Sequence, residues 1–142
     1  KEDIRVVQGV TSSISAAASL GAPLMHDFCQ ISLSDLMTDW SLIEKRLELA
    51  SMADFVICIY NPKSKGRPNH LRRAFEIMQA HKPATTPVGI VKNAGRINEE
   101  KYIRTLETMD FEVCDMSTMI IVGNKETYID GDKIITPRGY GI

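Results

Sequence analysis

The chain has 142 residues, of which 44% are hydrophobic and 25% are charged, and its formal net charge is −1 at pH 7. This composition is typical of one globular domain and excludes a fully disordered chain. The near-zero charge argues against a protein that coats nucleic acid, and no apolar run approaches the roughly 18 residues of a membrane helix.

Apolar runs and helical periodicities alternate along the first half of the chain. The pattern predicts a short buried strand at 4–7, a helix of small residues at 14–20 and a second strand at 28–33. Ile43, Leu47 and Ala50 recur with helical spacing in a helix predicted over 41–52. The continuous apolar run at 55–60 predicts an interior strand buried on both faces, as in a parallel sheet.

The second half continues the alternation. It predicts a helix that opens at Pro68, a buried strand at 88–91, a strand at 102–104, a helical turn at 105–109 and a strand at 118–122. Asp130 and Gly131 predict a hairpin turn between short strands. We therefore expect an α/β fold over residues 1–142, with a mostly parallel sheet flanked by helices and an antiparallel C-terminal hairpin.

The cysteines and histidines favour no metal site and no disulfide. Cys29, Cys58 and Cys114 form no CxxC pair, and the three histidines are scattered without ligand spacing. Free thiols and the lack of a visible secretory signal or membrane segment predict a cytoplasmic protein.

Four predicted strands are each followed by a loop of small or amide residues. These loops begin at Gly9, Tyr60, Asn93 and Val122. In open α/β sheets, ligands bind outside the carboxyl ends of the strands. Any one loop has an ordinary explanation, because Gly and Asn favour turns. Four of them together leave a ligand site at one edge of the sheet as an open alternative.

Three other segments also have two explanations each. Thr11 and Ser12 precede a helix, either as an N-cap or as an anion site. Ser32 and Asp35 follow a strand, where they either cap the next helix or face a substrate. A basic stretch forms either a solvated patch or a dock for a polyanion, which could be phosphates or the carboxylates of a small molecule. The stretch contains Lys63, Lys65, Arg67, Arg72 and Arg73.

Taken in order, the motifs of the chain resemble the tetrapyrrole methylase family. The resemblance rests on GVTS at 9–12 with the stretch to Phe28, YNPKSKGR at 60–67, VGIVKNAGR at 88–96, IIVGN at 120–124 and TPRGY at 136–140. ISLSDLMT at 31–38 resembles the branch that methylates ring carbon 17 of precorrin-3B or cobalt-precorrin-3. The family usually has Pro where this chain has Gln8, and it has an N-terminal domain before this region.

The resemblance implies a two-domain methyltransferase of cobalamin biosynthesis, with residues 1–8 as a linker strand and the rest as its C-terminal domain. It implies S-adenosylmethionine in a cleft between the domains, a tetrapyrrole substrate that is methylated at carbon 17 with ring contraction, and a homodimer. Carried over by position, the cofactor contacts are Thr11, Ser12, Tyr60, Asn61, Asn93, Ala94, Gly95, Val122 and Gly123. The substrate contacts are Ser32, Asp35, Lys65 and Arg67, and no catalytic residue is identified.

Two other functions remain open at this point. The chain is also compatible with a sibling methylase that acts on another ring carbon or on another class of substrate. A non-catalytic α/β module for ligand binding or dimerisation is the third alternative.

Overall fold

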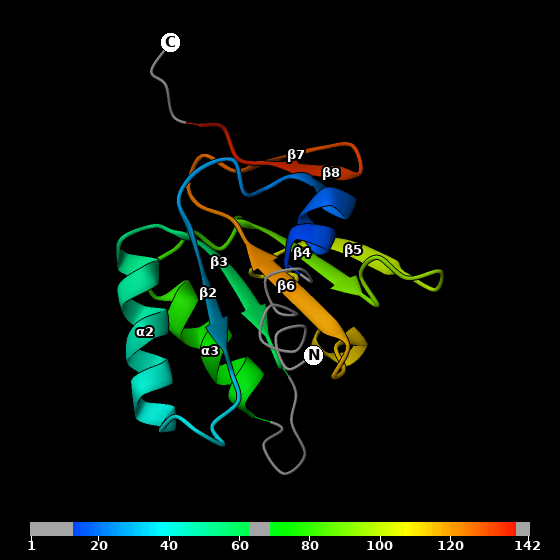
Figure 1. The fold of residues 1–142 in the computed structure, drawn as a ribbon. Helices are drawn as coiled ribbons and strands as arrows, with labels where there is room; N and C mark the ends of the chain where they lie inside the picture. The colour runs from blue at the N-terminus through cyan, green and yellow to red at the C-terminus, as the bar shows by residue number, and fades with distance from the viewer. Residues whose placement is uncertain (1–12, 63–68, 139–142) are drawn as a thin grey trace.

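The structure is a computed structural model that describes residues 13–62 and 69–138 (Figure 1). Residues 13–20 are helical and lead into β1 (Gly21–Ala22). The elements that follow, in chain order, are β2 (Phe28–Ser32), α2 (Trp40–Met52), β3 (Val56–Tyr60), α3 (His70–Gln79), β4 (Pro87–Lys92), β5 (Glu100–Thr105), the 3-10 helix η1 (Phe111–Val113), β6 (Thr118–Val122), β7 (Tyr128–Asp130) and β8 (Lys133–Ile135). The strand expected at 4–7 lies outside the described residues.

The main sheet has five strands in the order β2-β3-β6-β4-β5. β2 and β3 pair in parallel, whereas β6 pairs antiparallel with both β3 and β4, and β5 pairs antiparallel with β4. The α/β class is confirmed, but the prediction of a mostly parallel sheet is wrong. β2, β3 and β4 do run in one direction, and β6 enters between β3 and β4 in the opposite direction.

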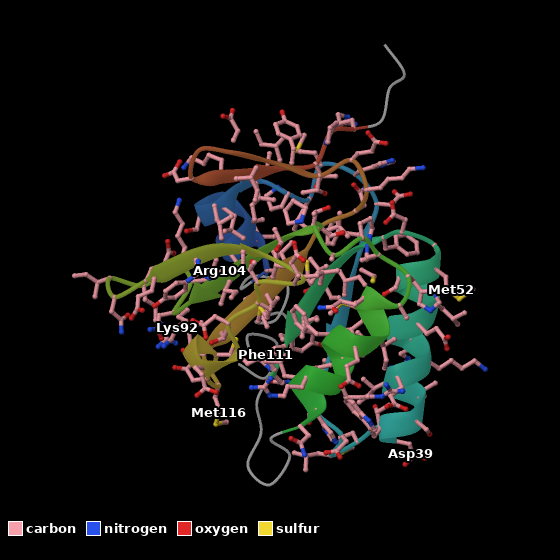
Figure 2. The ribbon with its side chains drawn as sticks, turned by 180° about the vertical axis from the view of Figure 1, so that it is seen from behind. Asp39, Met52, Lys92, Arg104, Phe111 and Met116 are labelled. Carbon is pink, nitrogen blue, oxygen red and sulfur yellow. The ribbon has the colours of Figure 1, made fainter. Side chains whose placement is uncertain are left out.

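One face of this sheet is covered by α2 and α3, which lie side by side in Figure 1. α2 buries Ile43 and Leu47 against the strands, as their helical spacing predicts, and α3 buries Leu71 and Phe75. Figure 2 shows this side of the molecule, with Phe111 of η1 beside α3. The Phe111 ring meets Phe75 edge to face, with ring centroids 5.3 Å apart. The helical turn expected at 105–109 is absent. In the segment that follows β5, the first helical residues are those of η1.

The opposite face is covered by helix 13–20 and by a second sheet of order β1-β8-β7. Leu20 of the helix and Ile134 of β8 pack over Gly89 of β4, where an added Cβ would lie 2.4 Å from Leu20 Cδ1. The absent side chain of Gly89 therefore lets three distant parts of the chain meet. With both faces covered, residues Val56 to Ile59 of β3 are fully buried.

The C-terminal hairpin is confirmed. β7 and β8 pair antiparallel, with Asp130 opposite Lys133, so that Gly131 and Asp132 form a two-residue loop. Gly131 has a φ of 63°, a conformation that glycine adopts without strain. β8 also pairs in parallel with β1, and this pairing ties the hairpin to the beginning of the described chain.

The three cysteines lie in different surroundings, as predicted. Cys29 packs on the face covered by α2 and α3, whereas Cys58 packs on the opposite face, so a bond between them would cross the sheet. Cys114 follows η1 and is buried. Burial raises the pKa of the Cys58 thiol to about 12. Within 13–62 and 69–138, no helix is both long and apolar enough to cross a membrane, and no cluster of three or more potential metal ligands occurs.

Candidate active site

The carboxyl ends of β2, β3 and β4 meet at one edge of the main sheet, because these three strands run in the same direction. β3 continues into Asn61 and β4 into Asn93, and these residues have φ values of 53° and 54°. Left-handed φ is uncommon outside glycine and most accessible to Asn and Asp. Both strands therefore turn sharply at the same edge, on either side of the first residue of β6.

A groove with a volume of about 420 Å³ opens at the ends of β2 and β3. Ile31 and Ile43 contribute apolar side chains to it, and the Asn61 side-chain amide donates a hydrogen bond to Ser32 Oγ at 3.0 Å. The lining residues are Gln30, Ile31, Ser32, Ser34, Met37, Thr38, Ile43, Arg46, Tyr60 and Asn61. The structure thus brings together Ser32, Tyr60 and Asn61, three of the residues that the resemblance assigns to ligands.

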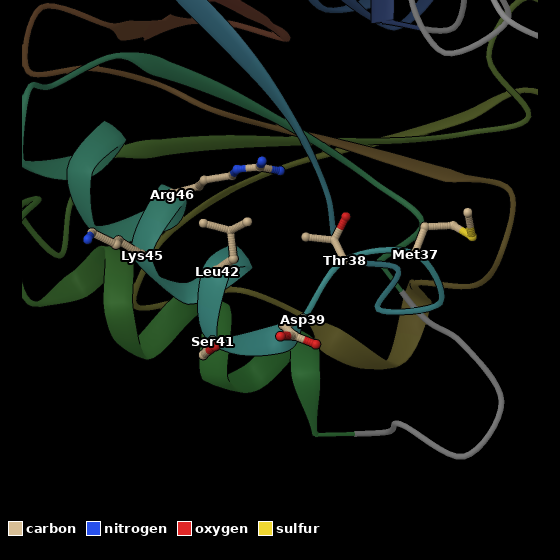
Figure 3. A pocket seen from close by; sticks show the side chains of 7 residues that line it. All are labelled: Met37, Thr38, Asp39, Ser41, Leu42, Lys45 and Arg46. Carbon is tan, nitrogen blue, oxygen red and sulfur yellow. The ribbon is translucent and has the colours of Figure 1, made fainter.

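A second, shallower hollow continues from the groove along α2 and shares Met37, Thr38 and Arg46 with it. Its volume is about 580 Å³, and Figure 3 shows the side chains that line it. Arg46 extends toward β2, whereas Lys45 on the same helix extends the other way. Met37 is 95% exposed, so an apolar side chain borders both hollows without cover from the described residues.

The loop between β4 and β5 is held in place by Glu99. One carboxylate oxygen of Glu99 accepts the backbone N–H of Gly95 at 2.8 Å, and the other accepts the Ser19 hydroxyl at 2.5 Å. The Ser19 and Gly95 hydrogen bonds hold the pKa of Glu99 below its usual value. Gly95 has a φ of 79°, and a Cβ there would lie 3.4 Å from Ser15 Oγ. Its N–H is occupied, so any ligand would meet this loop through other atoms.

Asp115 fixes the beginning of β6 between the two asparagine turns. Its carboxylate accepts hydrogen bonds from the Ser117 hydroxyl at 2.7 Å, the Ser117 backbone N–H at 2.8 Å and the Thr118 hydroxyl at 3.1 Å. It also pairs with Lys92 Nζ at 3.3 Å. These contacts, led by the Ser117 hydroxyl, lower the pKa of Asp115 to about 2. The carboxylate therefore organises the turn before the strand.

Val122 and Gly123 lie at the opposite edge of the sheet from Tyr60, Asn61 and the loop 93–95. Val122 is in register with Ile57, four residues before Asn61 on β3, which corresponds to about 13 Å. The Gly123 N–H donates to the Pro87 carbonyl, and the Gly123 carbonyl accepts a bond from buried Lys82. The expectation that these strand ends share one edge is therefore corrected for Val122 and Gly123. The reason is the reversed direction of β6.

None of the other predicted site residues is among the described residues that line the groove. Asn93, Ala94 and Gly95 lie at the groove's edge of the sheet, but they are separated from β3 by β6, a gap of about 10 Å. Asp35 lies in the loop after β2 and is not among the groove residues. The predictions for Thr11, Ser12, Lys65 and Arg67 fall outside the described residues.

Part of the basic stretch is engaged within the domain. Arg73 pairs with Glu44 at 2.8 Å and with Glu76 at 3.2 Å. Arg72 lies 4.5 Å from the centre of the Phe111 ring. These two arginines thus support the fold. Arg46, which does line the groove, escapes sequence reasoning because an arginine on the exposed face of a helix carries no distinguishing signal.

Comparison with known proteins gives a family match and close relatives. Residues 1–110 match the model of the tetrapyrrole (corrin/porphyrin) methylases. A probable cobalt-factor III C(17)-methyltransferase of Salmonella typhimurium is 60% identical over 138 residues, which are 97% of this chain and 57% of that protein. A precorrin-3B C(17)-methyltransferase of Sinorhizobium sp is 45% identical over 143 residues, covering 97% of this chain and 56% of that protein.

Solved structures agree with this match. The crystal structure of the methyltransferase CobJ superimposes with a TM-score of 0.84 at 35% identity, covering 88% of this chain and 52% of that one. A cobalt precorrin-4 methyltransferase, CbiF, shares the fold at 20% identity with a TM-score of 0.55, covering 79% of this chain and 48% of that one. The chain spans about half the length of the relatives that it matches.

Proposed function

Because the chain belongs to the tetrapyrrole (corrin/porphyrin) methylase family, we propose that it forms one side of the active site of a methyltransferase of cobalamin biosynthesis. The reaction is the S-adenosylmethionine-dependent methylation of precorrin-3B or cobalt-precorrin-3 at ring carbon 17, with ring contraction. The similarity to proteins named for carbon-17 methylation extends over 97% of the chain and supports this choice of carbon.

The observation that carries the proposal is the groove at the carboxyl ends of β2 and β3. Two adjacent parallel strands deliver Ser32, Tyr60 and Asn61 to one hollow, where open α/β sheets commonly bind ligands. The groove combines apolar side chains with hydroxyl and amide groups, which suits a flat, largely apolar macrocycle with polar side chains.

The loop after β4 is a suitable neighbour for the cofactor. Asn93 and Gly95 both adopt left-handed φ, and no described residue covers the position of a Gly95 Cβ more closely than Ser15 at 3.4 Å. Glu99 holds the loop in this conformation. We assign Tyr60, Asn61, Asn93, Ala94 and Gly95 to the cofactor. When bound, S-adenosylmethionine supplies an electrophilic methyl group.

The contribution of this domain to the chemistry is alignment. Among the described residues that line the groove there is no Asp, Glu, His or Cys. These residues therefore include none of the side chains that most often act as a general acid or base. Transfer of a methyl group to a nucleophilic carbon depends mainly on the distance and orientation of the two partners. Side chains held by packing and by the Asn61–Ser32 hydrogen bond provide that orientation.

The test uses the protein at its full natural length with cobalt-factor III and S-adenosylmethionine that carries a ¹³C-methyl group. The expected result is one labelled methyl group per macrocycle, located at carbon 17 by nuclear magnetic resonance. Asn61→Gly keeps the left-handed backbone while removing the side chain, and it should lower the rate at least tenfold. The matched control is Asn69→Ala, since Asn69 is exposed and its side chain caps nothing.

The same experiment separates the alternatives. A sibling methylase would place the label on a different ring carbon, and a non-catalytic module would transfer no label at all. The CbiF likeness, at 20% identity, reflects the shared fold and does not favour the sibling reaction. The homodimer and the cytoplasmic location stay predictions, to be measured by light scattering and by cell fractionation.

A further inference from the structure

Arg46 is the one charged side chain among the described residues that line the groove, and it also lines the neighbouring hollow. It projects from α2 toward β2, across the space between Leu42 and Thr38 (Figure 3). α2 is anchored by the burial of Ile43, one turn before Arg46, and of Leu47, the residue directly after it. The guanidinium is therefore carried by a fixed element at the junction of the two hollows.

Arg46 forms no ion pair or hydrogen bond within the part of the chain that the structure describes. The two acidic residues on the same helix face other partners. Glu44 Oε2 accepts bonds from Arg73 Nε at 2.8 Å and Trp40 Nε1 at 3.0 Å, and Glu48 Oε2 lies 3.5 Å from His81 Nε2. Asp39 also lines the second hollow, but it is not within ion-pair distance of Arg46. The positive charge is thus left without a fixed counter-charge at the mouth of the groove.

The surroundings indicate which kind of ligand this charge would bind. A guanidinium offers a planar fork of donors that fits a carboxylate with two hydrogen bonds. The adjacent Met37 and Leu42 supply exposed apolar surface, and Thr38 supplies a hydroxyl. S-adenosylmethionine also has one carboxylate, but its net charge is positive, which makes it the weaker match for this cationic site. A corrin precursor has an apolar ring with carboxylate side chains around its rim, and it matches both features.

We propose that Arg46 binds a side-chain carboxylate of the macrocycle and thereby sets the angle at which the ring enters the groove. This inference rests on the proposed function, since it needs the macrocycle in the groove. It assigns the α2 end of the groove to the substrate and leaves the Asn61 end for the cofactor. Arg46 is thus a binding residue for the substrate.

The test measures the affinity of the full-length protein for cobalt-factor III by its absorbance change, and for S-adenosylhomocysteine by calorimetry. Arg46→Gln should weaken macrocycle binding about tenfold to thirtyfold, the effect of losing one charge-assisted pair. Arg46→Lys should recover part of the loss, because a lysine keeps the charge but not the planar fork. Affinity for S-adenosylhomocysteine should be unchanged in both variants.

Lys45→Gln is the matched control, since it removes the same charge from the preceding residue, which borders the second hollow but not the groove and whose side chain extends away from the groove. It should change macrocycle affinity less than threefold. A macrocycle whose carboxylates are converted to amides should bind wild type and Arg46→Gln equally. Cooperative melts should show that all variants remain folded.

Three results would overturn the inference while the proposed function stands. They are normal macrocycle binding by Arg46→Gln, equal losses in Arg46→Gln and Lys45→Gln, and a loss of S-adenosylhomocysteine affinity in Arg46→Gln. Failure of the proposed function has a different signature, because wild type itself would then neither bind nor methylate the macrocycle.

Discussion

Lys82 illustrates how one buried side chain holds the edge of the sheet opposite the groove. Its side chain has no exposed surface, and its ammonium group donates to the Phe55 carbonyl at 2.8 Å, the Gly123 carbonyl at 2.9 Å and Asp54 Oδ1 at 3.2 Å. All three protons of the ammonium group are used. Burial lowers the pKa of Lys82, and the nearby Asp54 carboxylate opposes this shift. The residue links the end of α3 to the beginning of β3 and the end of β6.

Lys82→Met should destabilise the domain by about 3 kcal/mol, because it leaves two buried carbonyls and a carboxylate without their donor. Urea denaturation at neutral pH measures the free energy of unfolding. The control is Lys45→Met on the exposed side of α2, which should change that energy by less than about 0.5 kcal/mol. Equal effects of the two substitutions would contradict the structural role of Lys82.

Asp115 gives a prediction in pH. Its pKa in the folded state is about 2, against an ordinary value of 3.8, so the folded protein favours the ionised form. The resulting stability is present above pH 3.8 and is lost as the pH falls toward 2. Unfolding curves of wild type and Asp115→Asn should differ at pH 5 and converge near pH 2. A difference that stays constant over this range would show that the carboxylate charge is not involved.

Among the elements, β3 depends most on packing from both sides. Ile57 is fully buried on the face covered by α2 and α3, and its neighbour Cys58 is buried on the other. Ile57→Ala should cost about 2–5 kcal/mol, through the lost transfer energy and the cavity left behind. Denaturant unfolding provides the measurement. A loss below about 1 kcal/mol would mean that the surrounding side chains collapse into the space.

The β4–β5 loop supports a prediction about the cofactor. In the full-length protein, Gly95→Val should weaken S-adenosylhomocysteine binding at least tenfold, because it adds bulk and strains a residue with φ at 79°. Gly131→Val is the matched control. Gly131 also has left-handed φ, but nothing lies within 4 Å of its Cβ position and it belongs to the distant hairpin. Calorimetry that shows equal losses would remove this loop from the proposed cofactor site.

The limits of sequence reasoning are clearest at β6. The apolar run Thr118 to Val122 correctly predicts a strand, and in the structure all of its residues are buried. Burial on both faces comes from the covering helices and the second sheet, and these cover an antiparallel strand as well as a parallel one. The run therefore carries no information about direction. To place Val122 and Gly123 relative to the site, one must know the direction of β6. To place Ser32, Tyr60 and Asn61 together, one needs to know only that β2 and β3 are parallel neighbours.

At the scale of the molecule, the groove at the ends of β2 and β3 is open, and the chain spans 57% of the length of its Salmonella relative. Expressed alone, we expect it to melt cooperatively, since both faces of its sheet are covered. It should show no methyl transfer and should bind S-adenosylhomocysteine about a thousandfold more weakly than the full-length protein, which corresponds to about 4 kcal/mol of missing contacts. Low-micromolar binding or turnover by the isolated chain would show that the groove is a complete site.

The position of β6 also has a consequence for the order of events during synthesis. β6 is the last strand of the main sheet to leave the ribosome, yet it fills the place between β3 and β4. Until then, both strands present unpaired backbone edges, which are sites for misassociation with other chains. Nascent chains that have emerged from the ribosome only as far as Cys114 should bind chaperones. Nascent chains from which β6 has also emerged should no longer bind them. A slow stretch of translation between β4 and β6 would therefore lower the yield of native protein without changing a single residue.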